Sequence, residues 1–301
     1  MLAKIGLMQI KRVAYAMVVF NLFLSSTASA QPNSRGKYIG IAYVDNSNTL
    51  VEINPIAGTV KTVQSYPGLA GISFGISAVD AKNNRIYYFV ASNSLVGVNT
   101  ETGAIITNPP LAYPLSSLEY NTLTLELLGV TSISNVITFA EINPFGGDII
   151  PHKQYPGYTS VLYAVSAVDP IQNRFTFVMD GYLFTVDVPS GNVLSNPTVT
   201  QSFAWLEFDT KTSTLIGMTS IDKIQTLVKI DRQTGKLTTI ATYPGYSSVS
   251  LGLSTLNSNR NLLTFVMDNN LVTVRADTGQ ILFKPSVSHI NLSSFQFVPP
   301  K

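Results

Sequence analysis

The chain has no cysteine, only one tryptophan and only two histidines among its 301 residues. Without cysteine there can be no disulfide bond, no thiolate metal site and no lipid-modified cysteine, so stability has to come from packing. The two histidines, His152 and His289, have no second histidine or acid beside them at ligand spacing. A zinc site of the usual imidazole kind is therefore not expected, and we predict no bound metal of this type.

Charge is also scarce, since 12% of the residues are charged and 45% are hydrophobic. Residues 1–30 hold three of the 19 basic residues and none of the 17 acidic ones, so the rest of the chain has a formal charge of 16 − 17 = −1. Binding to a phosphate backbone needs a face rich in lysine and arginine. The composition therefore predicts no nucleic-acid partner.

The first residues predict export. A basic start, Lys4 to Arg12, precedes the mostly apolar run 13–24, and Ala28-Ser29-Ala30 forms a small-residue cleavage site. The apolar run is shorter than the ~20 residues of a bilayer span. An uncleaved anchor and a start at Met8 are the alternatives. We expect a signal peptide at 1–30, a linker at 31–36, and a secreted or periplasmic domain at 37–301 with no membrane span after signal removal.

Three stretches of the domain are copies of one another. Tyr66-Pro67-Gly68 recurs as Tyr155-Pro156-Gly157 and Tyr243-Pro244-Gly245, at steps of 155 − 66 = 89 and 243 − 155 = 88 residues. Each copy divides into two units of four short strands rich in Val, Ile, Leu, Thr, Tyr and Phe, joined by Asn, Asp and Gly turns about ten residues apart. A unit of about 45 residues has the size of a propeller blade.

The two ends of the repeat complete each other. Residues 38–44, 50–54 and 59–66 match the last three strands of a unit, whereas residues 294–297 match only its first strand. Three two-blade repeats closed in this way predict an all-β fold, a six-bladed β-propeller with approximate threefold symmetry, whose C-terminal strand pairs with the N-terminal strands. Three tandem sandwich domains are the alternative, but they would leave the first domain one strand short and the last strand without a sheet.

The blade pattern resembles a known group of repeats. Asn99 to Gly103 and Asp231 to Gly235 place a Thr-Gly turn between third and fourth strands, which is similar to blades of the broad quinoprotein, NHL and YVTN-type propellers. The resemblance covers residues 37–299 and rests on turn chemistry. It implies the fold and little about function, because such propellers include extracellular binding scaffolds as well as hydrolases and lyases.

Candidate site residues fall into three groups. Glu119 and Glu207 are related by the repeat, with Gln296 in the third place, all in first strands that line the central channel. They form either a ring around a ligand or metal, or an internal hydrogen-bond network. Asp180 and Asp268 stand in turns between second and third strands, where convergent carboxylates suit Ca²⁺ or sugar hydroxyls, although Asp also serves such turns structurally.

The third group lies where the chain crosses from blade to blade, near the expected mouth of the ring. Tyr158 and Tyr246 offer aromatic faces for a glycan or peptide, whereas Trp205, Gln201 and His289 depart from the repeat and so are not required by symmetry.

Together these features favour a monomeric, non-catalytic binding scaffold that presents a loop-rich face to a protein, glycan or small molecule, without a cofactor. The alternative is a hydrolase or lyase with acids and His289 at the channel mouth, with or without Ca²⁺.

Overall fold

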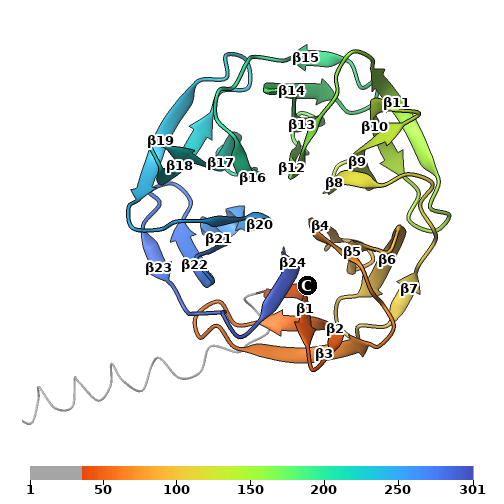
Figure 1. The fold of residues 1–301 in the computed structure, drawn as a ribbon, viewed down its shortest axis with the longest axis vertical. Coiled ribbons are helices and arrows are strands. Elements are labelled where there is room, and N and C mark those ends of the chain that lie inside the picture. The colour runs from red at the N-terminus through yellow and green to blue at the C-terminus, as the bar shows by residue number, and fades with distance from the viewer. Residues whose placement is uncertain (1–35, 301) are drawn as a thin grey trace, which may run out of the picture. The chain divides into compact units, whose positions relative to one another are not determined.

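Short strands and tight turns alternate along the chain and form six four-stranded antiparallel sheets. The computed structural model describes residues 36–300, so the predicted signal peptide and the linker up to residue 35 lie outside the described residues. Lys37–Pro299 forms one unit, in which the sheets stand as blades around a central axis (Figure 1). The prediction of an all-β, six-bladed propeller is confirmed.

In each blade the strands follow one another from the axis outward. From the inside, the first blade contains β24 (Asn291–Val298), β1 (Lys37–Val44), β2 (Ser47–Ile53) and β3 (Val60–Tyr66). The second contains β4 (Ile72–Asp80), β5 (Ile86–Ala91), β6 (Ser94–Asn99) and β7 (Ile105–Thr107). The third contains β8 (Leu115–Asn121), β9 (Glu126–Ile133), β10 (Val136–Ile142) and β11 (Ile149–Tyr155).

The other three blades repeat this order. The fourth contains β12 (Val161–Asp169), β13 (Arg174–Met179), β14 (Tyr182–Asp187) and β15 (Val193–Ser195). The fifth contains β16 (Phe203–Asp209), β17 (Thr214–Ile221), β18 (Ile224–Ile230) and β19 (Leu237–Tyr243). The sixth contains β20 (Val249–Asn257), β21 (Leu262–Met267), β22 (Asn270–Arg275) and β23 (Ile281–Phe283), with the short 3-10 helix η2 (Ser258–Arg260) after β20.

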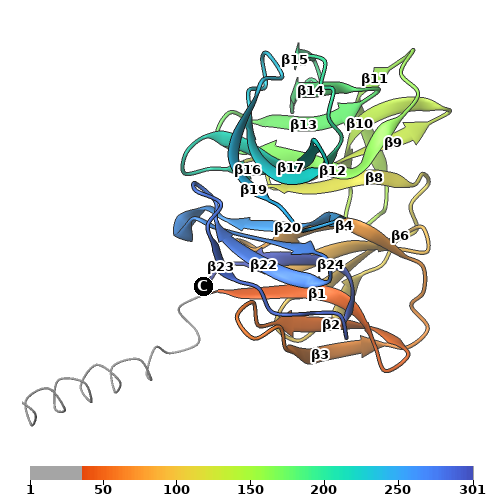
Figure 2. The same ribbon diagram turned by 60° about the vertical axis from the view of Figure 1, so that its left-hand side comes forward.

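The ring is closed by strands from opposite ends of the unit. β24 pairs antiparallel with β1, which places Phe297 opposite Tyr38 and Phe295 opposite Gly40. The two strands lie side by side in both views (Figures 1 and 2). The predicted closure is therefore confirmed, and the innermost strand of the first blade comes from a segment far away in sequence.

Apolar side chains fill the spaces between neighbouring blades, with one hydrophobic cluster at each of the six interfaces. Where the sixth blade meets the first, Phe295 packs in one cluster with Leu253 and Val266. Burying these side chains supplies most of the stabilisation available to a chain without disulfide bonds.

The tyrosines of the three Tyr-Pro-Gly segments join each odd-numbered blade to the next one. Their hydroxyl groups donate to glycine carbonyl oxygens in the third-to-fourth-strand turns of the neighbouring blade: Tyr66 to Gly103 at 2.7 Å, Tyr155 to Gly191 at 2.8 Å, and Tyr243 to Gly279 at 2.9 Å. The tyrosine side chains are buried, so these bonds stabilise the ring. The repetition of the segment thus has a structural explanation.

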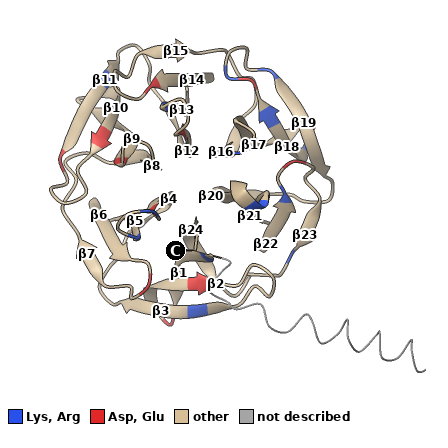
Figure 3. Cartoon of the chain, turned by 180° about the vertical axis from the view of Figure 1, so that it is seen from behind, with Lys and Arg blue, Asp and Glu red and all other residues tan. Residues whose placement is uncertain are grey.

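Ion pairs cross between blades at Lys37–Glu101 and Arg232–Asp169, whereas Arg85–Glu101 lies within the second blade. Lys37 and Arg85 both contact the Glu101 carboxylate, at 2.9 and 2.8 Å, and Arg232 contacts the buried Asp169 at 2.9 Å. Charged positions are otherwise scattered among the blades (Figure 3). Within residues 36–300 no helix has the length and apolar character needed to cross a membrane.

Candidate functional site: a closed-ended pocket on the axis

The six innermost strands bring polar side chains to the axis from every blade. Glu119 on β8, Glu207 on β16 and Gln296 on β24 alternate around the ring with serines on the strands between them, Ser77 on β4, Ser166 on β12 and Ser254 on β20. The structure thus brings together the three residues that the repeat related. It adds three serines that sequence reasoning did not single out.

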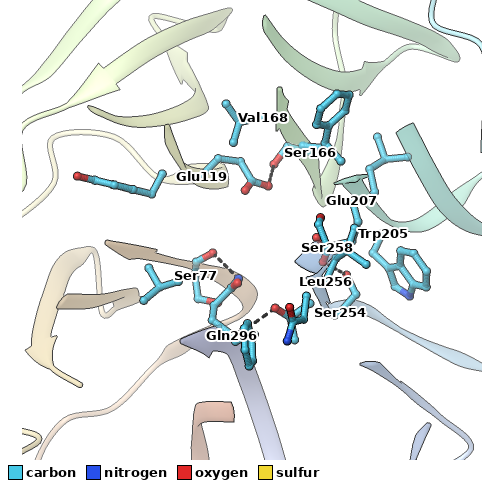
Figure 4. A pocket seen from close by; sticks show the side chains of 18 of the residues that line it. Ser77, Glu119, Ser166, Val168, Trp205, Glu207, Ser254, Leu256, Ser258 and Gln296 are labelled. Carbon is cyan, nitrogen blue, oxygen red and sulfur yellow. Dashed lines mark hydrogen bonds between the residues drawn. The ribbon is translucent and has the colours of Figure 1, made fainter. Parts of the chain in front are cut away.

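Each acid or amide is bonded to the serine of the next blade. Ser166 Oγ donates to Glu119 Oε1 at 2.8 Å, and Ser254 Oγ donates to Glu207 Oε1 at 2.8 Å. In the third place the direction of the bond is reversed, because Gln296 Nε2 donates to the Ser77 carbonyl oxygen at 3.2 Å (Figure 4). The same geometry therefore holds two carboxyl groups and one amide.

Small residues close one end of the channel. Gly75, Ala164 and Gly252 occupy equivalent places on β4, β12 and β20, all with positive φ (74°, 57° and 61°), where each strand shifts its register against its neighbour. A methyl group added to Gly75 would lie 2.9 Å from the Ala164 Cβ and 2.8 Å from the Leu251 carbonyl oxygen. The three backbones therefore meet at the axis, and side chains larger than these would not fit.

The rest of the channel is a pocket of about 380 Å³. Its lining runs from the Gly75, Ala164 and Gly252 constriction, past the two glutamates, to residues that follow the innermost strands, such as Thr122, Thr210 and Asn259. The mouth therefore lies on the face that carries the turns between first and second strands, which we call the pocket face. The sequence analysis placed the mouth on the opposite face, where the blade crossings lie, because the constriction was not foreseen.

Burial perturbs both carboxyl groups. Loss of solvation raises the pKa of Glu119 well above its ordinary value, the charge of Glu207 raises it further, and the bond from Ser166 acts in the opposite direction. Loss of solvation raises the pKa of Glu207 to about 7, against the lowering effect of Ser254. Glu207 therefore exchanges its proton readily near neutral pH, as titratable groups at functional sites often do, whereas burial favours the protonated form of Glu119.

No lysine, arginine or histidine is among the described residues that line this pocket. Residues 36–300 also contain no group of three or more His, Cys, Asp or Glu side chains placed to hold a metal ion. Glu119 and Glu207, with Gln296 and the three serine hydroxyls, are the oxygen ligands that the innermost strands bring together at one level of the pocket.

Trp205 lines the pocket wall, but its ring lies elsewhere. The side chain is 1% exposed and its ring centroid is 5.4 Å from that of Phe265, between the fifth and sixth blades. Figure 4 shows the indole directed away from the carboxyl groups. The indole therefore belongs to the core between the blades.

Asp180 and Asp268 hold the crossings between blades. The Asp180 carboxylate accepts bonds from the backbone nitrogens of Thr159 and Ser160, both at 2.8 Å, and Asp268 accepts equivalent bonds from Ser247 and Ser248 at 2.9 and 2.8 Å. The bond from the Ser160 hydroxyl and the backbone bonds lower the pKa of Asp180, and the backbone bond from Ser247 with the hydroxyl bonds lowers the pKa of Asp268. Such bonds are what Asp makes in tight connections, so a structural role explains both residues.

The other predicted residues also lie outside the pocket lining. Tyr158 packs edge-on against Phe184, with centroids 5.0 Å apart, and Lys284 Nζ stands 5.3 Å above the Tyr246 ring. Gln201 accepts a bond from Thr200 Oγ1 at 2.8 Å, and His289 is exposed between β23 and β24. The structure therefore does not bring His289 into the pocket with the two glutamates, an arrangement that the enzyme alternative requires.

A signal for the missed residues was present in the repeat. Ser77, Ser166 and Ser254 stand at steps of 166 − 77 = 89 and 254 − 166 = 88, and Gly75, Ala164 and Gly252 stand two residues before them. Placing the equivalent positions side by side would have shown three serines and three small residues on the strands between the glutamates.

No protein-family model matches the sequence, and no curated protein is similar enough to match it. Among solved structures, the fold is similar to a chain of the nidogen/laminin complex, with 12% identity, a TM-score of 0.62, and 88% of this chain and 99% of that chain covered. It is also similar to TolB from Acinetobacter baumannii, with 12% identity, a TM-score of 0.62, and 94% and 71% covered. A putative 6-phosphogluconolactonase from Bacteroides uniformis has 11% identity, a TM-score of 0.53, and 88% and 100% covered. Likeness at this level of identity establishes the propeller fold alone.

Proposed function

We propose that this protein is an exported, non-catalytic propeller that binds a ligand in its central pocket. The observation that carries the proposal is the convergence of hydrogen-bonding groups from all six blades into a pocket closed at one end by Gly75, Ala164 and Gly252. A concave site with a few convergent polar groups among apolar ones is the usual form of a small-molecule site. A chain of the same fold occurs in a protein complex, that of nidogen and laminin, which is compatible with a binding role.

The lining favours binding over turnover. Each pocket serine bonded to a glutamate donates its proton to a carboxyl oxygen, but the pocket lining offers no histidine, lysine or arginine to stabilise a developing negative charge. An acyl-transfer mechanism would need such a group or a pair of backbone donors aimed at the reacting oxygen.

One observation favours a second candidate, a propeller hydrolase or lyase. Glu207 has a pKa of about 7, which suits a general acid or base at neutral pH. The two candidates differ in what Glu207→Gln would do: an enzyme would keep its ligand and lose turnover, whereas a binding protein has no turnover to lose.

A ligand-induced thermal-shift screen tests the binding function. We would screen glycans, short peptides, small amines and Ca²⁺ with the wild type and with two variants. Thr210→Trp places a large ring at the pocket mouth, and Thr242→Trp makes the same change on the exposed outer strand β19. A pocket ligand should raise the melting temperature of the wild type and of Thr242→Trp but not of Thr210→Trp. A ligand that stabilises all three proteins equally would place binding elsewhere and overturn the proposal.

Export rests on the basic start, the apolar run and the Ala28-Ser29-Ala30 site of the sequence. Mass spectrometry of the protein recovered from the periplasm or medium of an expressing cell should give a chain that begins at Gln31. A cytoplasmic protein with residues 1–30 intact would contradict this part of the proposal. Light scattering would test the expected monomer.

A further inference from the structure

We propose that the ligand of the central pocket is a linear aliphatic diamine, with one ammonium group on Glu119 and the other on Glu207. The inference deepens the proposed function and rests on it, because it requires a ligand in this pocket. It follows from the hydrogen bonds that the two carboxyl groups leave unmade, from the absence of a cation to pair with them, and from the apolar side chains around them.

Each glutamate has one oxygen to spare. The Oε1 atoms of Glu119 and Glu207 accept the serine hydroxyls, whereas among the described residues the two Oε2 atoms have no hydrogen-bond partner. Both side chains are half-buried in the pocket wall, and a carboxylate held away from bulk water needs a counter-charge or good hydration. An ammonium group, with three donors and a positive charge, supplies what each Oε2 lacks.

Among residues 36–300, none that lines the pocket carries a positive charge. The titratable side chains of the lining are Glu119, Glu207 and Tyr120, none of them basic. Three arginines lie next to the lining. Arg232 stands 5.1 Å from the centroid of the Phe208 ring and is paired with Asp169, and Arg85 donates to the Pro299 carbonyl oxygen at 3.3 Å and is paired with Glu101. Arg260, on η2 directly after the lining residue Asn259, is exposed and does not itself line the pocket. The pocket therefore selects a positive ligand when the glutamates are ionised.

The remaining lining suits a hydrocarbon chain. Val79, Val168 and Leu256 stand two residues after the three serines on the same strands and are partly exposed, and Phe297 adds aromatic surface. Methylene groups gain free energy against such surfaces, and aromatic faces attract ammonium groups.

Other cations and neutral ligands match the pocket less well. Ca²⁺ takes six to eight oxygen ligands at short distance, and the described residues include no cluster of three or more acids or histidines that could hold an ion. A neutral polyol would leave both carboxyl groups without a counter-charge. The third place, occupied by Gln296, is neutral and already donates to Ser77, so two positive charges complete the site.

Isothermal titration calorimetry tests the inference, with putrescine and cadaverine as probes and butanediol and butylamine as controls. We expect a diamine to bind, butylamine to bind at least about tenfold more weakly, and butanediol not to bind. Glu119→Gln and Glu207→Gln should each weaken diamine binding by about tenfold or more, since each removes one charge-assisted hydrogen bond. Asp222→Asn, in an exposed turn outside the pocket, is the matched control and should bind as the wild type does.

The carboxyl groups also give a second readout. A bound cation favours the ionised form of both carboxyl groups. Because the pKa of Glu207 is about 7, its ionisation on binding should release protons near neutral pH, and binding should tighten as the pH rises from about 6 to about 8. The released protons appear as a dependence of the heat on the ionisation enthalpy of the buffer. If the Gln variants weakened binding only by disturbing the structure, the dependence of the heat on the buffer would be the same in the variants as in the wild type.

The outcomes separate the two proposals. Diamine binding that is lost in the Gln variants and in Thr210→Trp supports both. If another ligand from the screen is blocked by Thr210→Trp while diamines do not bind, or bind equally well to the Gln variants, the diamine assignment is wrong and the binding function stands. Binding of Ca²⁺ in place of diamines would also overturn the assignment. If no compound is sensitive to Thr210→Trp, both proposals fall.

Discussion

Removing the Phe295 ring should weaken the closure of the whole propeller. The side chain is 1% exposed and packs with Leu253 and Val266 of the sixth blade while its backbone pairs with β1. Transfer of the ring from the core accounts for about 2 kcal/mol. If the neighbours leave a cavity of roughly 50 Å³, the cavity adds about 1 kcal/mol. We therefore expect Phe295→Ala to lower the free energy of unfolding by about 3 to 4 kcal/mol.

Urea unfolding measures this loss, with Phe283→Ala as the matched control. Phe283 is 36% exposed on the outer strand β23, so its truncation should change stability by about 0.5 kcal/mol or less. Hydrogen exchange should show the amides of β1 less protected in Phe295→Ala than in the wild type. A loss below about 1 kcal/mol, or one equal to that of the control, would refute the packing argument.

Deleting residues 291–301 should have a larger effect. The deletion removes the whole of β24 and with it Leu292, Phe295 and Val298, each at least nine-tenths buried and each stabilising by about 2 kcal/mol. It also leaves the inner edge of β1 without a partner. A thermal melt of the truncated protein that matched the full chain would show that closure contributes little.

Three further predictions concern the constriction on the axis, the tyrosine hydrogen bonds between blades, and pH. Ala164→Gly should be neutral or stabilise the protein by about 1 kcal/mol, because φ is 57° there. Gly252→Ala should destabilise it, because the added methyl would lie 2.6 Å from the Ala164 Cβ. Chemical denaturation of the two variants tests both. Tyr155→Phe removes the bond to the Gly191 carbonyl and should cost about 1 to 2 kcal/mol in the same assay. The folded-state pKa of Glu207, about 7, exceeds its ordinary value of 4.5, so the protonated group favours the fold below about pH 4.5 and this contribution is lost as pH rises through about 7. Glu207→Gln should therefore raise the melting temperature relative to wild type at pH 8 and change it little at pH 5, and equal differences at both pH values would contradict the assigned shift.

Much of the fold follows from local signals in the sequence. The Thr102-Gly103 turn and its copies mark the hairpins, and the unmatched strand at residues 294–297 could pair only with the incomplete unit at the start of the domain. Both features depend on residue type and spacing, which a sequence displays directly.

The pocket was predicted only in part. Glu119 and Glu207 could be placed on the axis because the repeat assigns them to first strands. The constriction could not be predicted, because it depends on a positive φ at Ala164, and alanine rarely adopts that backbone conformation. The face on which the pocket opens follows from that constriction, so it could not be predicted from the sequence either.

Trp205 shows why a departure from the repeat can mislead. Its repeat equivalents are Ser117 and Ser294, and the Tyr87 hydroxyl of the next blade donates to Ser294 Oγ at 2.6 Å. The residue equivalent to Tyr87 is Leu263, which shares a cluster with Trp205. A larger side chain on one strand thus compensates a smaller one on its neighbour, as close packing requires. The departure of Trp205 from the repeat is therefore explained by packing, although it was predicted to mark a binding residue.

The pairing of β24 with β1 has a consequence for the newly made chain. During synthesis β1 emerges about 250 residues before β24, so the oldest sheet waits without its axial strand while five others are produced. Until β24 is made, the edge of Lys37–Val44 exposes unpaired backbone groups, and the apolar side chains that the finished fold buries are exposed too. The exposed edge of β1 is therefore prone to pair with other extended segments until β24 has been made. A chaperone that binds extended segments would recognise the chain at this edge.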